Sequence, residues 1–166
     1  MKKLLILLLS IPFMVFEQSS DIPTETYLKE QEKLFIELLN EERESMGLPQ
    51  LVFNQEIYDT ASTPKCKIMM ENHNADHVSR DIVPTNSGNL ATILTLKKGY
   101  DKDIYKEIFK RYRNSPLHWK ELTRKELTEV SIKLNFSEVV SLSNDSFFKE
   151  IGFIGKVYSS CDIYIK

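Results

Sequence analysis

The 166-residue sequence has little of the residue types that mark several large functional classes. Its five glycines form neither a phosphate-binding loop nor a dinucleotide-binding fingerprint. It has no excess of positive charge, because 22 lysines and arginines stand against 24 aspartates and glutamates, for a net charge of -2. A nucleic-acid-binding surface needs a basic patch. The sequence therefore argues against nucleic acid as a partner.

Signatures of nucleophilic catalysis are also missing from the sequence. No serine stands in a Gly-x-Ser-x-Gly elbow, and Cys66 and Cys161 lack both Cys-x-x-Cys spacing and an electropositive setting. We therefore name no catalytic residue. The two cysteines leave two alternatives open, which are a disulfide in an oxidising compartment and a pair of buried thiols that act as small hydrophobes.

One long apolar run is present, at residues 4–16, directly after Lys2 and Lys3. A positive start followed by an apolar run too short for a comfortable membrane span is typical of a signal peptide. We predict an exported protein, with residues 1–20 as signal peptide cleaved near Ser20 and residues 21–166 as one domain. An uncleaved signal anchor is the alternative. Beyond this segment we expect no transmembrane domain.

The apolar spacing predicts helices in the first part of the chain and strands in the last. Helices are expected over 22–47, from Asn54 onward with a kink at Pro64, and from Asp101 to about 113. Residues 90–96 fit either a short helix or a strand. Alternation from Glu129 to Phe136 predicts a strand, and 163–165 is expected to be a separate last strand. This order predicts an α+β domain.

The stretch from residue 114 to 136 holds two candidate site residues. Ser115 followed by Pro116 is a helix-start signature, with the Ser115 side chain as the expected cap, and it places His118 in the first helical turn. Glu129 stands at the entrance of the following strand. A histidine and a carboxylate at the starts of consecutive elements can converge on one cavity.

An ordered set of short motifs, covering the chain from about Tyr27 to its end, resembles the CAP superfamily. This superfamily includes cysteine-rich secretory proteins, antigen 5, plant pathogenesis-related proteins and bacterial single-domain proteins described as SCP-like. The motifs are Leu38-Leu39-Asn40-x-x-Arg43, Gly47-Leu48-Pro49-x-Leu51-x-Phe53-Asn54, Ala61, His77, Ser87-Gly88-Asn89-Leu90-Ala91, Asn114-Ser115-Pro116-Leu117-His118 and Thr128-Glu129-Val130.

The resemblance implies an α-β-α sandwich, with a central antiparallel sheet between helical layers and an open cavity lined by two histidines and two acidic residues. Gly88 stands where the second acidic residue belongs, so the cavity looks degenerate. Candidates to replace that residue are Glu126, Asp76 and Glu71. The candidate cavity residues are His77, His118, Glu129, Asn89 and Ser115.

Three functions from different classes follow from this resemblance. The first is a secreted or surface-exposed, non-enzymatic binding module for a lipid-like or sterol-like small molecule or an extracellular protein partner. The second is a metal-dependent hydrolase, in which His77, His118 and Glu129 hold zinc or another divalent cation with one coordination position open. The third is a structural domain with a vestigial cavity. Beyond this possible metal, no cofactor is expected.

Overall fold

The computed structural model describes residues 22–75, 87–100, 102–138 and 152–165. The predicted signal peptide, its cleavage and His77 lie outside the described residues and stay predictions. None of the described helices combines the length and the apolar character that crossing a membrane requires.

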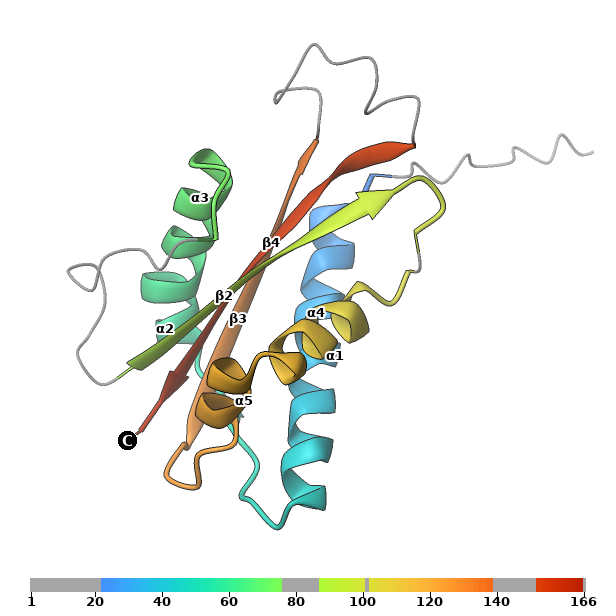
Figure 1. The fold of residues 1–166 in the computed structure, drawn as a ribbon. Coiled ribbons are helices and arrows are strands. Elements are labelled where there is room, and N and C mark those ends of the chain that lie inside the picture. Colours follow the sequence, from blue (N-terminus) through green and yellow to red (C-terminus); the bar gives the residue numbers. More distant parts are fainter. Residues whose placement is uncertain (1–21, 76–86, 101, 139–151, 166) are drawn as a thin grey trace, which may run out of the picture.

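In chain order the elements are α1 (Glu25–Ser45), β1 (Val52–Phe53), α2 (Gln55–Ile57), the π-helix η1 (Tyr58–Ser62), α3 (Thr63–Glu71), β2 (Ser87–Lys97), α4 (Ile104–Asn114), α5 (Pro116–Leu122), β3 (Glu129–Glu138) and β4 (Phe153–Tyr164) (Figure 1).

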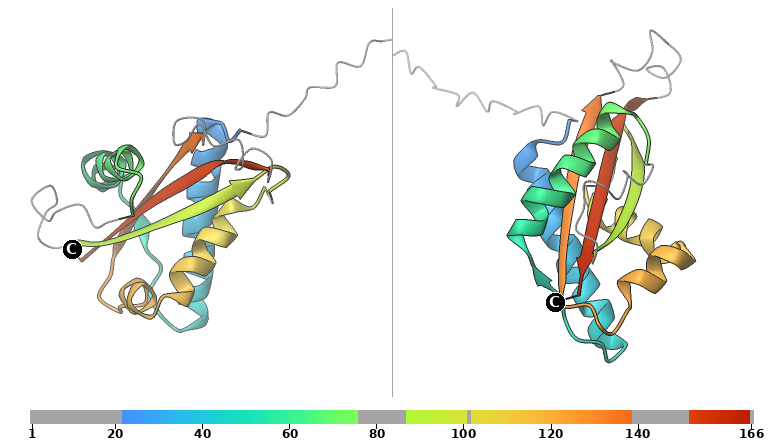
Figure 2. Two further views of the ribbon diagram at one scale, coloured as in Figure 1. Left: turned by 45° about the horizontal axis from the view of Figure 1, so that its top comes forward. Right: turned by 90° about the vertical axis from the view of Figure 1, so that its left-hand side faces the viewer.

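The described strands form one sheet in the order β1-β3-β4-β2. β4 pairs antiparallel with both β2 and β3, whereas the short β1 runs parallel to β3. The sheet is therefore mixed rather than wholly antiparallel. Helices α2 and α3 lie on one side of it, and α1 and α4 lie on the other (Figures 1 and 2). The predicted α+β sandwich is confirmed.

Helix α1 starts three residues later than the predicted 22–47 and ends beside the predicted stop at Gly47. The Thr24 side chain accepts a hydrogen bond from the Tyr27 amide at 3.2 Å, which caps the first turn. At the other end, Gly47 has a φ of +71°, and the Leu48 amide donates back to the Arg43 carbonyl at 2.9 Å. This closing turn needs a left-handed residue, which glycine supplies without steric cost.

Pro64 is accommodated by an irregular helix. The five residues before Thr63 form the π-helix η1, and α3 then starts with Pro64 in its first turn. Proline has no amide hydrogen to donate, and the first turn of a helix is the place where that loss costs little. The predicted kink at Pro64 thus takes the form of a π-helical turn followed by a new helix.

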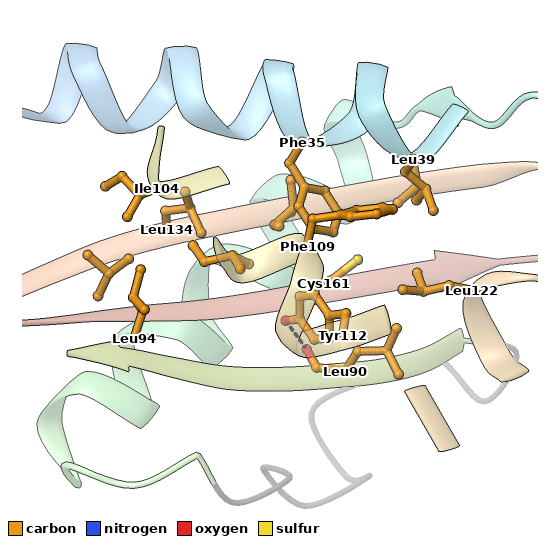
Figure 3. Close-up of a cluster of buried hydrophobic side chains, with 14 of the residues drawn as sticks. Phe35, Leu39, Leu90, Leu94, Ile104, Phe109, Tyr112, Leu122, Leu134 and Cys161 are labelled. Atoms are coloured by element: carbon orange, nitrogen blue, oxygen red, sulfur yellow. Dashed lines mark hydrogen bonds between the residues drawn. The ribbon is translucent and has the colours of Figure 1, made fainter. Parts of the chain in front are cut away.

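An apolar core fills the space between the sheet and helices α1, α4 and α5 (Figure 3). Phe35 on α1 meets Phe109 and Tyr112 on α4 edge to face, with ring centroids 5.8 and 5.7 Å apart. The strands contribute alternate residues to the same core, including Leu90, Ile132 and Cys161. We call this side of the sheet the apolar face.

The opposite side of the sheet buries a polar network, and we call it the polar face. Lys65 on α3 donates a hydrogen bond to Asp162 on β4, and both side chains are fully buried. Ser62 also donates to Asp162, at 2.7 Å, and its hydroxyl lies 2.6 Å from that of Ser131 on β3. The network joins η1 and α3 to the two central strands.

Cys66 and Cys161 are free thiols, so the disulfide alternative is wrong. Cys161 lies in the core of the apolar face (Figure 3), whereas Cys66 packs on the polar face with Tyr158 and Ala91. Cys161 on β4 points to the apolar face, whereas Cys66 on α3 packs against Tyr158, which points to the polar face. The sheet therefore lies between the two sulfur atoms.

The strand predictions were partly correct. Residues 90–96 belong to the strand β2, which resolves the ambiguity between helix and strand. Residues 163–165 do not form a separate strand, since Ile163 and Tyr164 are the last two residues of the long strand β4. Asp101 lies outside the described residues, and α4 starts at Ile104.

Candidate functional site

His118 lies in the first turn of α5, as the sequence predicts, and its side chain is half-buried. Its ring and the Tyr112 ring meet edge to face, with centroids 5.4 Å apart. Burial raises the pKa of Tyr112 well above its ordinary value, which keeps the phenol protonated. The Tyr112 hydroxyl donates to the Leu90 carbonyl at 3.2 Å. Near the C-terminal end of α4, the neutral and hydrogen-bonded ring of Tyr112 therefore packs against the imidazole of His118.

Ser115 occupies the predicted N-cap position of α5 but does not cap the helix as expected. Its backbone is extended, with φ -94° and ψ 111°, and its side chain makes no capping hydrogen bond. Only its carbonyl takes part, accepting from the Trp119 amide at 2.8 Å. The start of α5 is set by the backbone and by Pro116, whose ring fixes φ in the helical range.

Glu129 is the first residue of β3, as predicted, and is half-buried. Its carboxylate accepts a hydrogen bond from the Asn54 side chain at 2.7 Å. The other end of the same amide caps α2, because Asn54 Oδ1 accepts from the Ile57 amide at 3.0 Å. One asparagine therefore joins the start of α2 to the start of β3 and orients Glu129.

Gly88 lies near the start of β2, opposite Ile163. A Cβ atom on Gly88 would stand 2.9 Å from Ile163 Cγ1 and 3.8 Å from a carboxylate oxygen of Glu121. Glu121 follows His118 by three residues on α5, a spacing that puts two side chains on one helix face. Glu121 thus brings a carboxylate to the place where the family pattern has an acidic residue.

Sequence reasoning missed Glu121 and named other residues as replacements. Glu126 and Glu71 are exposed and pair with Arg124 at 3.8 Å and Lys67 at 3.9 Å, while Asp76 lies outside the described residues. The spacing of Glu121 from His118 was the available signal. It pointed to a shared helix face, but not to the strand that this face covers.

The remaining candidate residues are only partly visible. Asn89 belongs to β2 and pairs in register with Asp162, but its side chain lies outside what the structure describes, as does His77 altogether. Across the described parts of the chain, no three histidine, cysteine, aspartate or glutamate side chains stand close enough to hold a metal ion. His118, Glu121 and Glu129 by themselves therefore do not fit a divalent cation.

Two motif residues hold the elements that carry these side chains. Arg43 on α1 is fully buried, and its guanidinium donates to the carbonyls of Leu122 at 2.7 Å and Arg124 at 3.1 Å, at the end of α5. Asn40 makes a two-way contact with Leu51, donating to its carbonyl at 2.9 Å and accepting from its amide at 2.7 Å. Both residues act on the scaffold rather than on a ligand.

The sequence matches no protein-family model and no curated protein. Solved structures do resemble the fold. An outer surface protein from Borrelia burgdorferi has a TM-score of 0.56 at 12% identity, over 83% of this chain and 95% of that one. An extracellular protein containing a SCP domain from Bacillus anthracis str. Ames has a TM-score of 0.55 at 17% identity, over 86% of this chain and 44% of that one.

A third similar structure is that of NaASP2 with Zn2+, with a TM-score of 0.54 at 11% identity, over 84% of this chain and 82% of that one. Identities this low show the fold and nothing finer. The motif order, the layered sheet and these three likenesses agree with one another. The chain has the CAP/SCP-like fold.

Proposed function

We propose that this protein is an exported, secreted or surface-exposed binding module, and that it recognises a lipid-like or sterol-like small molecule or an extracellular protein partner without catalysing a reaction. The observation that carries this proposal is that the two carboxylates of the candidate site, Glu121 and Glu129, already contact Arg124 and Asn54. The similar structures include an outer surface protein and an extracellular protein, which supports an exported location.

The contacts of the remaining carboxylates favour binding over catalysis. Glu121, the carboxylate beside Gly88, is paired with Arg124 at 3.2 Å, and Glu129 accepts a hydrogen bond from Asn54. A general base works best when its pKa lies near the working pH and its oxygens face the substrate. Carboxylates that are held by a guanidinium and by an amide are better suited to maintaining the shape of a cavity.

A metal-dependent hydrolase is the second candidate, with His77, His118 and Glu129 as ligands and Glu121 nearby. One observation favours it, because a similar structure, that of NaASP2, contains Zn2+. A bound zinc ion would polarise a carbonyl or activate water. The third candidate, a structural domain with a vestigial cavity, would bind neither a metal nor a small molecule.

Zinc titration followed by thermal unfolding separates the first two candidates. We expect no zinc-dependent rise in Tm for the wild type, and equal behaviour in a His77→Ala/His118→Ala double variant. His73→Ala is the matched control, because His73 is an exposed histidine at the end of α3. A rise in Tm that the double variant loses and His73→Ala keeps would overturn the proposal in favour of the hydrolase.

A direct test of binding is the native mass spectrum of the exported protein. A co-purified small molecule, or a protein captured together with it, supports the binding module. If neither is retained, the structural domain becomes the better description. The intact mass also reports whether residues 1–20 are removed.

A further inference from the structure

The two outer strands of the sheet, β1 and β2, differ in length. β1 has two residues and leads at once into α2, which Asn54 caps. β2 has 11 residues, from Ser87 to Lys97, and among the described strands it pairs with β4 alone (Figure 1). A long outer strand presents a row of amide and carbonyl groups with which another strand can pair. The outer side of β2 is therefore a candidate interaction surface.

The hydrogen bonds of the central strands show which way the backbone of β2 points. The Leu134 amide on β3 donates to Glu32 at 2.8 Å and not to β4, so Leu134 and its partner Ser159 form a non-hydrogen-bonded pair. Ser159 therefore directs its own amide and carbonyl toward β2, where it pairs with Thr92. It follows that the backbone groups of Thr92 point inward, to β4.

Because this direction alternates along a strand, the amides and carbonyls of Ala91, Ile93 and Thr95 point outward. Within the described ranges, no hydrogen bond outside the strand ladders reaches them. Natural proteins block an open edge with proline, charge or a bulge. From residue 87 to 96 this strand has neither a proline nor a charged residue, and its pairing with β4 is irregular only at its last step. The edge is open to a further strand.

A second copy of the chain fits this edge through a two-fold axis. When the axis stands perpendicular to the sheet, two antiparallel copies of β2 pair about one residue, and side chains on the same face of each copy stay on the same face. Full overlap of residues 87–97 places the axis at Thr92. Ala91 then exchanges hydrogen bonds with Ile93 of the second copy. The outward groups of both strands make about eight hydrogen bonds in all.

The side chains that this register brings together match in size and polarity. Gly88 comes opposite Leu96 of the second copy, and Ala91 comes opposite Ile93, so that a small residue faces a large one in both pairs. Thr92 meets Thr92 of the second copy, and threonine pairs across strands are favourable. The edge is thus complementary to itself.

The charge of the strand also permits this register. Lys97 is its only charged residue, and it faces Ser87 of the second copy. The two copies of Lys97 therefore lie about 34 Å apart, which is several Debye lengths at physiological salt. Two strands of this length bury less surface than the roughly 1,200–2,000 Å² of a stable complex. We expect a reversible dimer with a Kd on the order of 10–100 µM.

We propose that two copies of this chain associate by antiparallel pairing of their β2 strands, which joins the two four-stranded sheets into one continuous sheet. The occupant of the edge is a second copy because the two-fold register satisfies the outward backbone groups, pairs small residues with large ones and keeps the lysines apart. This interaction goes beyond the proposed function, which concerns the His118 cavity.

Sedimentation of the exported protein between about 5 and 500 µM measures the association. We expect a shift from monomer to dimer across this range, and a protein that remains monomeric at 500 µM would overturn the proposal. Thr95→Pro removes one outward amide and should weaken the dimer about tenfold or more, whereas the control Thr95→Ala keeps the amide and should change the Kd less than about twofold. Equal association of the two variants would also overturn it.

A cysteine on the two-fold axis tests the register without relying on the proline variant. In a non-hydrogen-bonded pair the Cα atoms lie about 4.5 Å apart, which a disulfide can span. Mild oxidation of Thr92→Cys should give a covalent dimer. The control Thr95→Cys should not, because its two thiols would lie about 20 Å apart. Cys66 and Cys161 are buried in both variants. Equal cross-linking of the two variants, or none in Thr92→Cys, would overturn the proposal.

Discussion

The two faces of the sheet bury side chains of opposite character. On the apolar face, Phe35 and Leu39 pack on the strands with aromatic and aliphatic neighbours. On the polar face, Lys65 and Asp162 are equally buried but are held by an ion pair. Apolar contacts are non-directional, whereas charged hydrogen bonds hold only in a narrow geometry. The apolar face therefore supplies most of the driving force for folding, while the polar network determines how η1 and α3 sit on the sheet.

The difference also explains where the π-helix occurs. A π-helical turn is rare, and it appears here directly before α3, the helix that carries Lys65, with Ser62 as its last residue. The hydroxyl of Ser62 contacts both Ser131 and Asp162. The irregular turn thus coincides with the point at which the helix must meet two strands through hydrogen bonds, and the helices on the apolar face show no such turn among the residues described.

The largest expected effect of a single substitution on this comparison comes from Lys65→Met. Removing the cation leaves Asp162 buried without its ion-pair partner, which should lower the free energy of unfolding by about 3 to 5 kcal/mol. Urea unfolding measures this loss, and adding Asp162→Asn should restore part of it. Lys67→Met, which breaks an exposed pair, is the control and should cost less than about 0.5 kcal/mol. Similar losses for both single variants would show that the network contributes little.

The two faces each bury one thiol, and both should destabilise the protein at alkaline pH. Burial raises the pKa of Cys66 to about 12 and that of Cys161 well above its ordinary value. Above about pH 8.5 an unfolded thiol ionises and a buried one does not, so stability is full below that pH and falls as pH rises. For Cys66 the loss is about 1.4 kcal/mol at pH 9.5, and Cys161 adds a loss in the same direction.

Urea unfolding from pH 7 to 10 checks this expectation against a Cys66→Ala/Cys161→Ala variant, which should lose less stability across the same range. Parallel profiles for the two proteins would contradict it. Thiol titration without reductant offers an independent check. A thiol reagent should detect both cysteines after unfolding, and it should react slowly with either one in the native protein.

The smallest expected effect compares the helix starts of the two layers. Asn54 caps α2 and also binds Glu129, so Asn54→Ala should cost about 1 to 2 kcal/mol. Ser115→Ala, at the start of α5, should cost less than about 0.5 kcal/mol, because its side chain makes no capping bond. Urea unfolding of both variants tests the pair. A greater loss for Ser115→Ala would mean that its hydroxyl holds the site after all.

Much of the fold was predictable from short-range patterns, and much of the candidate site was not. The start of β3 at Glu129 and the cap at Asn54 depend on a few neighbouring residues, and both were predicted correctly. The place of Glu121 over Gly88 depends on how α5 lies across β2, which no local pattern reports. Ser115 shows the reverse error, because a favourable local motif predicted a bond that the packed helix does not make.

The sequence by itself determined the presence of the first helix and its stop at Gly47, the helix start at Pro116 and the alternation that divides β3 between two faces. These features arise from steric preferences and from periodic burial within a few residues of each other. Only the tertiary structure decided that Lys65 meets Asp162, that the two cysteines stay apart, and that β2 pairs with β4 at the edge of the sheet. Such contacts join residues distant in sequence, and they exist only once the sheet and its helices have packed together.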